Sequence, residues 1–137
     1  MADISDLAVF DLSRFPVHLG LGAKVIRQPQ FTGGMDWYNG YGERNGADGL
    51  EGRLVTIHSF AAPWDTWEMH PKGDELVLCL AGRITLHQEI DGSVHSATLE
   101  PHQAIVNAPG VWHTADASGP VTALFITAGM GTEIRPR

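Results

Sequence analysis

Short extended runs separated by turn residues make up most of the chain after residue 52. The runs are rich in β-branched and other apolar residues, and proline or glycine stands between most neighbours. They cover residues 53–60, 67–70, 75–80, 83–89, 94–99, 104–107, 112–115 and 121–127. Asp91-Gly92 separates two of these runs and is a strong signal for a tight hairpin. Because no long stretch has the 3.6-residue period of a helix, the pattern predicts an all-β sandwich or barrel.

The first 52 residues have a different pattern. Residues 23–28 predict one strand, and residues 32–49 are so rich in glycine and aromatic residues that they favour turns and an exposed loop over a helix. We therefore predict a single domain with two parts. Residues 1–52 form an N-terminal extension whose strand and Gly/aromatic loop pack on the barrel, and residues 53–137 form the barrel and an extended C-terminal tail.

The run at residues 75–80 is apolar on both faces. Val77 and Cys79 share one face with Glu75, and the opposite face carries Leu76, Leu78 and Leu80. Protein must therefore cover both faces, and a second copy of the chain on the outer face predicts a homodimer.

Composition and charge narrow the class of protein. Hydrophobic residues make up 43% of the 137 residues, as in a folded globule, and the formal net charge of −7 argues against nucleic acid or an acidic membrane surface as a partner. Cys79 is the single cysteine, so no internal disulfide forms and a reducing compartment is favoured. The N-terminus lacks the pattern of a signal peptide, and no apolar run reaches the ~18 residues of a membrane span. We expect a cytoplasmic protein that binds a small molecule.

Four potential metal ligands lie near the centre of the barrel sequence. Glu68 and His70 are two residues apart, so both side chains leave the same face of a strand, and Glu75 opens the next strand after a Pro-Lys-Gly turn. His113 is the natural fourth member. Two carboxylates and two imidazoles at one point would be poorly solvated without a cation, which predicts a divalent metal. Iron or manganese is favoured because carboxylates are hard ligands, and zinc and nickel are the alternatives.

The same residues resemble the two motifs of the cupin superfamily. Glu68-Met69-His70, then Glu75, then Gly82 is similar to the first motif, and Gly110 with His113 is similar to the second. The resemblance covers roughly residues 53–127. It implies an all-β cupin barrel, a jelly roll or double-stranded β-helix, with a metal held inside by His70, Glu75 and His113.

Three positions depart from the family pattern. Glu68 stands where the first motif has a histidine, His102 stands where the second motif opens with glycine, and Ala108 stands where that motif has a proline. The phrase Trp-Glu-x-His-Pro-x-Gly-Asp-Glu resembles a subgroup of small single-domain bacterial cupins. Glu68 therefore has three interpretations, as a fourth metal ligand, as an ion-pair partner, or as an acid or base that faces the substrate.

These patterns predict a metal-dependent cupin enzyme that acts on a small organic acid or a sugar-like substrate. Dioxygenase, isomerase and lyase chemistry all remain open. Glu68 and His58 are the candidate catalytic groups, although His58 could equally be a hydrogen-bonded strand residue. The alternative is a non-catalytic binding or sensing cupin with a structural metal or none. His87 and His102 fall at expected surface or turn positions, and His18 and His95 carry no signal.

Overall fold

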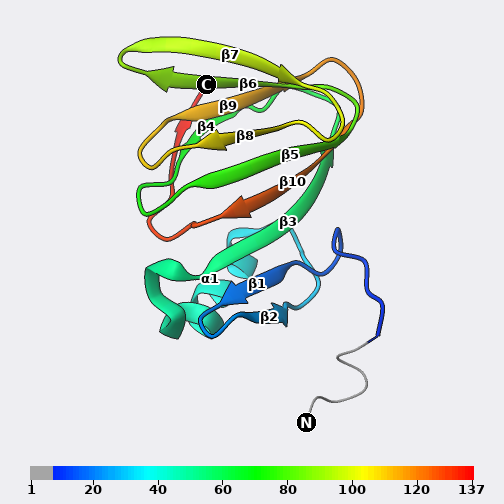
Figure 1. Ribbon diagram of the computed structural model, residues 1–137, viewed down its shortest axis with the longest axis vertical. Helices are drawn as coiled ribbons and strands as arrows, with labels where there is room; N and C mark the ends of the chain where they lie inside the picture. The colour runs from blue at the N-terminus through cyan, green and yellow to red at the C-terminus, as the bar shows by residue number, and fades with distance from the viewer. Residues whose placement is uncertain (1–7) are drawn as a thin grey trace.

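Two antiparallel sheets face each other in the computed structural model, which describes residues 8–137 (Figure 1). The six-stranded sheet contains, in spatial order, β2 (Lys24–Arg27), β1 (Val17–Gly20), β3 (Arg53–Phe60), β10 (Val121–Thr127), β5 (Glu75–Ala81) and β8 (Ala104–Asn107). The five-stranded sheet contains β11 (Glu133–Pro136), β4 (Thr66–Met69), β9 (His113–Ala117), β6 (Ile84–Ile90) and β7 (Ser93–Leu99). The predicted all-β class is confirmed.

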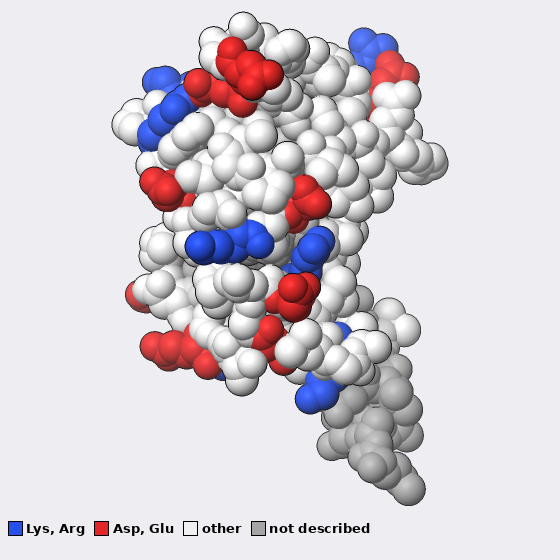
Figure 2. Space-filling view, turned by 60° about the vertical axis from the view of Figure 1, so that its left-hand side comes forward, with Lys and Arg blue, Asp and Glu red and all other residues white. Residues whose placement is uncertain are grey.

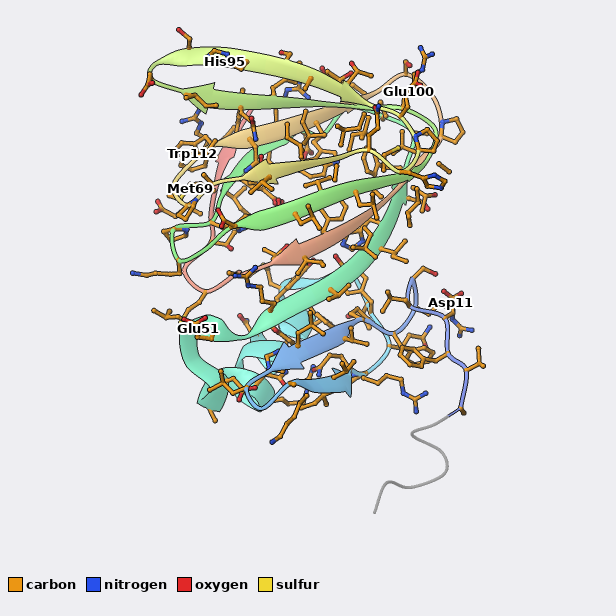
Figure 3. The ribbon with its side chains drawn as sticks, viewed as in Figure 1. Asp11, Glu51, Met69, His95, Glu100 and Trp112 are labelled. Carbon is orange, nitrogen blue, oxygen red and sulfur yellow. The ribbon has the colours of Figure 1, made fainter. Side chains whose placement is uncertain are left out.

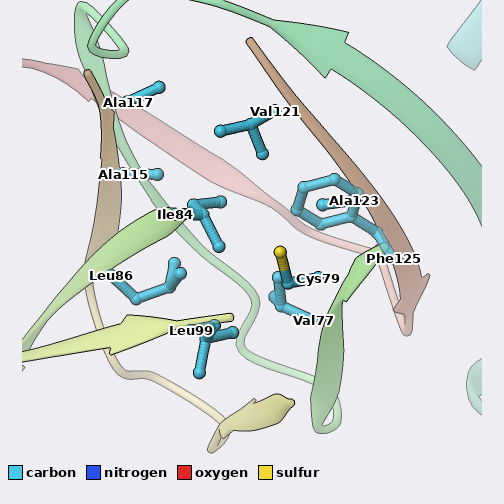
Figure 4. Close-up of a cluster of buried hydrophobic side chains, with 10 residues drawn as sticks. All are labelled: Val77, Cys79, Ile84, Leu86, Leu99, Ala115, Ala117, Val121, Ala123 and Phe125. Carbon is cyan, nitrogen blue, oxygen red and sulfur yellow. The ribbon is translucent and has the colours of Figure 1, made fainter. Parts of the chain in front are cut away.

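The inward face of the barrel changes from polar to apolar along its strands. On β5 the buried residues are Glu75, then Val77 and Cys79. On β9 the inward-facing residues are His113, then Ala115 and Ala117, and on β10 they are, in chain order, Val121, Ala123, Phe125 and Thr127. The apolar positions join residues of β6 and β7 in one buried cluster (Figure 4). That cluster fills one end of the barrel, so a polar site can occupy the other end without giving up the core.

The hairpin between β6 and β7 turns at the expected residues. Asp91 has φ 52° and Gly92 has φ 79°, the pair of positive values that a two-residue type I′ turn requires. The hairpin prediction is confirmed.

Gly82 is a second glycine in the left-handed region, and its surroundings are crowded. Its φ is +75°, and a Cβ built there would lie 2.1 Å from the backbone carbonyl oxygen of Pro120. Gly92 has almost the same φ but nothing within 4 Å of such a Cβ. We expect Gly92→Ala to lower the free energy of unfolding by about 1 kcal/mol and Gly82→Ala by at least about 2 kcal/mol more, because only Gly82 combines strain with a backbone clash. Urea denaturation of the matched pair measures the difference, and equal midpoints would refute this assignment.

A helix replaces most of the loop predicted for residues 32–49. α1 spans Met35–Asn45 and the 3₁₀ segment η2 spans Gly46–Glu51, so that prediction was wrong. Tertiary contacts outweigh the poor helix propensity of the glycines. Trp37 is buried, its indole N–H donates to the carbonyl of Pro29 at 3.1 Å, and its ring packs edge-on against Phe31. β1, β2 and α1 lie beside β3 at one side of the barrel (Figure 1).

The C-terminal residues form a strand instead of the extended tail expected from the sequence. β11 pairs with β4 over Glu133–Pro136, and the backbone N–H of Arg137 donates to the carbonyl of Asp65 at 3.0 Å. The Arg135 guanidinium lies over the rings of Trp67 and Trp112, with 4.4 Å to the centroid of Trp112. These cation–π contacts attach the strand to the outside of the sheet, and they cannot be foreseen from Arg135 alone.

The outer surface does not test the predicted homodimer. Leu76, Leu78 and Leu80 face outward from β5 and are less buried than Val77 and Cys79, so the homodimer stays a prediction. On the face in Figure 2, Lys and Arg side chains lie among Asp and Glu side chains and do not gather into one large patch. Within residues 8–137, no helix has the length and apolar character that a membrane span requires.

Candidate metal centre

Sheet register places the polar ends of the strands at one level. In the six-stranded sheet, Glu75 pairs with Thr127 on one side and Asn107 on the other. In the five-stranded sheet, His113 pairs with Glu68 and Gln88. The amide of Gln88 donates to Asn107 Oδ1 at 2.7 Å and so links the two rows. Residues far apart in the sequence therefore converge because a strand turns alternate side chains to the same face.

Residues next to the two site histidines in the sequence show at which end of the barrel the site lies. Met69 and Trp112, which precede the two site histidines in the sequence, lie at one end, and Glu100 lies at the other (Figure 3). The polar ends of the strands thus gather opposite the turn that carries Glu100.

Glu75 is the most enclosed carboxylate of the site, with 3% of its surface exposed. Its Oε1 accepts a hydrogen bond from Asn107 Nδ2 at 3.1 Å, and its Oε2 accepts one from the Thr127 hydroxyl at 2.7 Å. The same two oxygens lie 3.2 Å from His113 Nε2 and 3.1 Å from His70 Nε2. Burial by itself would raise the pKa of Glu75, but the two imidazoles outweigh it and hold the pKa well below its usual range. Glu75 is therefore a fixed negative charge between two histidines.

Both site histidines have their Nδ1 atoms committed to oxygen acceptors. His113 Nδ1 donates to the carbonyl of Val111 at 3.1 Å. His70 Nδ1 lies 2.8 Å from the hydroxyl of Thr132, which donates its own hydrogen to Gly129 and must therefore accept from the imidazole. With the proton held on Nδ1, a neutral imidazole keeps a free lone pair on Nε2.

The two Nε2 atoms are what a metal would use. Those of His70 and His113 are buried and make no well-formed hydrogen bond among the described residues, although the two Glu75 oxygens lie 3.1 and 3.2 Å from them. Buried polar atoms of this kind need a partner, and a histidine held through Nδ1 is the usual arrangement of a metal ligand. The donor set of two imidazoles and nearby carboxylates fits a divalent transition metal.

Glu68 completes a set of three close donors. One ligand atom from each of Glu68, His70 and His113 lies within 4.8 Å of the others. Burial raises the pKa of Glu68, and the negative charge of Glu75 raises it further. The structure thus brings together all four residues that the sequence predicted as ligands: three meet this distance, and Glu75 contacts both histidines. The assignment of all four as ligands stays a prediction.

His58 also faces the interior, as one of its two interpretations requires. It lies on β3 with its ring between those of Phe31, at 5.2 Å, and Phe125, at 5.6 Å. Burial lowers the pKa of His58, which favours the neutral imidazole. His58 lines the same cavity as Glu68, so its position is compatible with proton transfer to a ligand in that cavity. That role stays a prediction.

A cavity of about 530 Å³ opens beside Glu68, His70 and Glu75. Its volume is in the range of small-molecule sites. Helix α1 forms part of its wall through Met35, Tyr38 and neighbouring residues, although sequence reasoning assigned no site residue there. Burial raises the pKa of Tyr38, and the charges of Glu68 and Glu75 add to the shift, so this hydroxyl keeps its proton and can donate it to a ligand.

A buried histidine fastens this wall to the barrel. His18 Nε2 lies 2.6 Å from Asp48 Oδ2, and His18 Nδ1 lies 2.6 Å from the Tyr41 hydroxyl. Burial and the charge of Asp48 raise the pKa of Tyr41 to about 12, so the tyrosine donates to Nδ1 while Nε2–H donates to the carboxylate. A Cβ at Gly52 would lie 2.7 Å from the His18 ring, which explains the glycine there. Sequence reasoning missed this clasp of His18, Tyr41 and Asp48.

Breaking the clasp should loosen α1. We expect His18→Ala to lower the free energy of unfolding by about 2 to 3 kcal/mol, because it removes a buried ring and leaves two polar partners unpaired. His95→Ala, at an exposed strand position, is the matched control and should stay within about 0.5 kcal/mol of the unaltered protein. Denaturant unfolding measures both values, and amide hydrogen exchange should become faster in α1 for the first variant alone. Unchanged exchange in α1 would contradict the clasp.

Comparison with known proteins supports the fold. No protein-family model matches the chain, and no curated protein matches it in sequence. An oxalate oxidase solved with the substrate analogue glycolate superposes with a TM-score of 0.52 and 14% identity, over 61% of this chain and 45% of that chain. The fold is the cupin jelly roll. The chain thus spans less than half of the oxalate oxidase, and at this identity the similarity establishes the fold alone.

Two further structures are similar at lower scores. A cupin-2 domain containing protein from Shewanella frigidimarina NCIMB 400 has a TM-score of 0.46 and 19% identity, over 62% of this chain and 71% of that chain. Protein NMB1881 from Neisseria meningitidis has a TM-score of 0.47 and 14% identity, over 54% and 71%. The superposition on oxalate oxidase confirms the predicted jelly-roll fold, and the subgroup of small bacterial cupins stays a prediction.

Proposed function

We propose that this cupin is a metal-dependent enzyme that acts on a small oxygen-bearing molecule. The observation that carries the proposal is the pair of buried Nε2 atoms on His70 and His113, each opposite an Nδ1 that is held by an oxygen acceptor. That arrangement supports metal binding better than a structural role, because a structural histidine uses both ring nitrogens in hydrogen bonds.

The four residues have distinct tasks in this proposal. His70 and His113 hold the ion through Nε2, and Glu75, fixed by Asn107 and Thr127, supplies negative charge beside them. Glu68 is the fourth ligand or the nearby acid or base. A bound iron or manganese ion would polarise a substrate oxygen or activate dioxygen. Dioxygenase, isomerase and lyase chemistry are all compatible with this arrangement.

Proton transfer falls to Glu68 or His58. Burial and the charge of Glu75 raise the pKa of Glu68, which favours the protonated carboxyl as a proton donor, and burial lowers the pKa of His58, which favours the neutral imidazole as a proton acceptor. Both side chains line the cavity in which a substrate would bind.

A substrate screen on metal-loaded protein tests the proposal. The organic acids and sugar-like molecules expected from the sequence form the first panel, assayed with and without dioxygen. Turnover should appear with the unaltered protein, and whichever of Glu68→Gln and His58→Gln removes the proton carrier should reduce it about 10² to 10⁴-fold with metal content retained. Stoichiometric metal and ligand binding without turnover of any panel member would instead favour the binding or sensing alternative.

A further inference from the structure

The charged side chains that line the cavity indicate which kind of ligand it can bind. Among the described residues that line it, neither lysine nor arginine occurs. The ionisable groups are the carboxyls of Glu68 and Glu75, two tyrosines, and the histidines 18, 58 and 70. His18 is already paired with Asp48, and His58 lies between two aromatic rings. No side chain of the lining therefore offers an unpaired positive charge to an anion.

Three arginines elsewhere in the described chain contact other groups. Arg44, the arginine of α1, donates to the side-chain oxygen of Gln28 and lies over the Trp37 ring. Arg135 pairs with Glu89, and Arg137 pairs with Asp116 at 2.6 Å. A substrate carboxylate or phosphate is normally held by such a guanidinium, and these are not available to the cavity.

A bound divalent ion would not give the cavity a net positive charge. The carboxyl groups of Glu68 and Glu75 lie beside the two histidines that would hold it. Two carboxylates that bind a divalent ion would balance its charge, so the loaded site would be close to neutral. An anionic ligand would then find no positive charge to offset its own.

Aromatic and thioether side chains make up much of the cavity wall. They belong to Met35, Tyr38, Tyr41, Trp64, Phe125 and Met130, and the polar residues Asn39, Asn45 and Thr56 also line the cavity. Aromatic and thioether surfaces favour a ligand with a flat, apolar body. Glu68, His70 and Glu75 mark the end at which a metal would bind.

We propose that the cavity selects an uncharged ligand with a ring-sized apolar body and a hydroxyl or carbonyl oxygen at the end that meets the metal. This inference rests on the proposed function and narrows it: of the substrate classes expected from the sequence, a charged organic acid does not match the lining. Two features of the lining determine the selection, the absence of a lysine or arginine and the aromatic and thioether side chains of the wall.

Two ligands of similar shape but different charge test whether the cavity selects against an anion. 2′-Hydroxyacetophenone and salicylate share the ring, the ring hydroxyl ortho to the side group and a carbonyl oxygen, and only salicylate is an anion. Calorimetric titration of manganese-loaded protein should show the neutral ketone binding about tenfold or more tightly than salicylate. Metal content is measured first on the same sample, so a failure to bind manganese counts against the proposed function and not against ligand selection alone.

A variant then reverses the charge balance. Met35 lines the cavity and is 65% exposed, so Met35→Lys should fold and place a cation at the wall. We expect the ratio of the two affinities to fall at least about threefold in this variant, because the anion gains a partner. Equal affinities, tighter binding of salicylate, no binding of either probe, or a ratio that Met35→Lys leaves unchanged would overturn the inference.

Discussion

Replacing Glu75 with glutamine is expected to lower the metal affinity by about 100-fold or more. Glu75 contacts both histidines, and its two oxygens are held in place by Asn107 and Thr127. The amide has nearly the same shape as the carboxylate but carries no negative charge. One carboxylate oxygen becomes an NH2 group, which cannot accept the hydrogen bond that Asn107 or Thr127 donates at that position. The variant thus loses the charge that offsets the cation while keeping the volume of the side chain.

Asp74→Asn is the matched control for this change. Asp74 is the exposed neighbour of Glu75, so the same chemical substitution should leave metal affinity unchanged. Competition with a chelator of known affinity measures both variants and the unaltered protein. Equal affinities for Glu75→Gln and the unaltered protein would remove Glu75 from the metal site, although it could still hold the two imidazoles in place.

Metal loading should raise the thermal stability of the protein by on the order of 10 °C. An ion that binds only the folded chain stabilises it by about 2.7 kcal/mol at 100 times its Kd. For a domain of this size, that free energy corresponds to an upward shift of roughly this magnitude in Tm. The effect should be large here because two buried imidazole nitrogens without a well-formed hydrogen bond would gain the ion as a partner.

Scanning calorimetry on chelator-stripped protein, with and without added manganese, measures the shift. His113→Gln should lose it, since an amide replaces a ligand whose Nδ1 is fixed to the carbonyl of Val111. His95→Ala, at an exposed position on β7, should retain it. A shift of the same size in His113→Gln would place the stabilising ion somewhere other than the barrel site.

Sequence reasoning found the ligand cluster because its geometry follows from the two-residue period of a strand. Glu68 and His70 share a face for that reason, and the apolar partners of Glu75 on β5 mark it as inward-facing. The partners of Glu75 were missed. Asn107 lies in phase with the inward residue Ile105, and Thr127 lies in phase with Phe125, so continuing the alternation to the strand ends could have found both.

The N-terminal part could not be predicted in the same way. α1 has four positions, counted from Met35 to Asn45, that glycine or asparagine occupies, namely Asn39, Gly40, Gly42 and Asn45, and its stability comes from packing of Trp37 that local propensity cannot reveal. His18 has its partners 23 and 30 positions away, in segments whose folding was itself unexpected. Long-range contacts of this kind depend on tertiary structure, and they decide how the cavity is walled.

The most direct test of the central claim is the metal content of protein purified without a histidine tag. After exposure to manganese, iron, zinc or nickel and removal of unbound ion, mass spectrometry should find about one divalent ion per chain in the unaltered protein. The double variant His70→Gln and His113→Gln, checked for folding by circular dichroism, should hold less than about a tenth of that amount. An unaltered chain that retains none of the four metals, or a folded double variant that retains a full equivalent, would contradict the site described here.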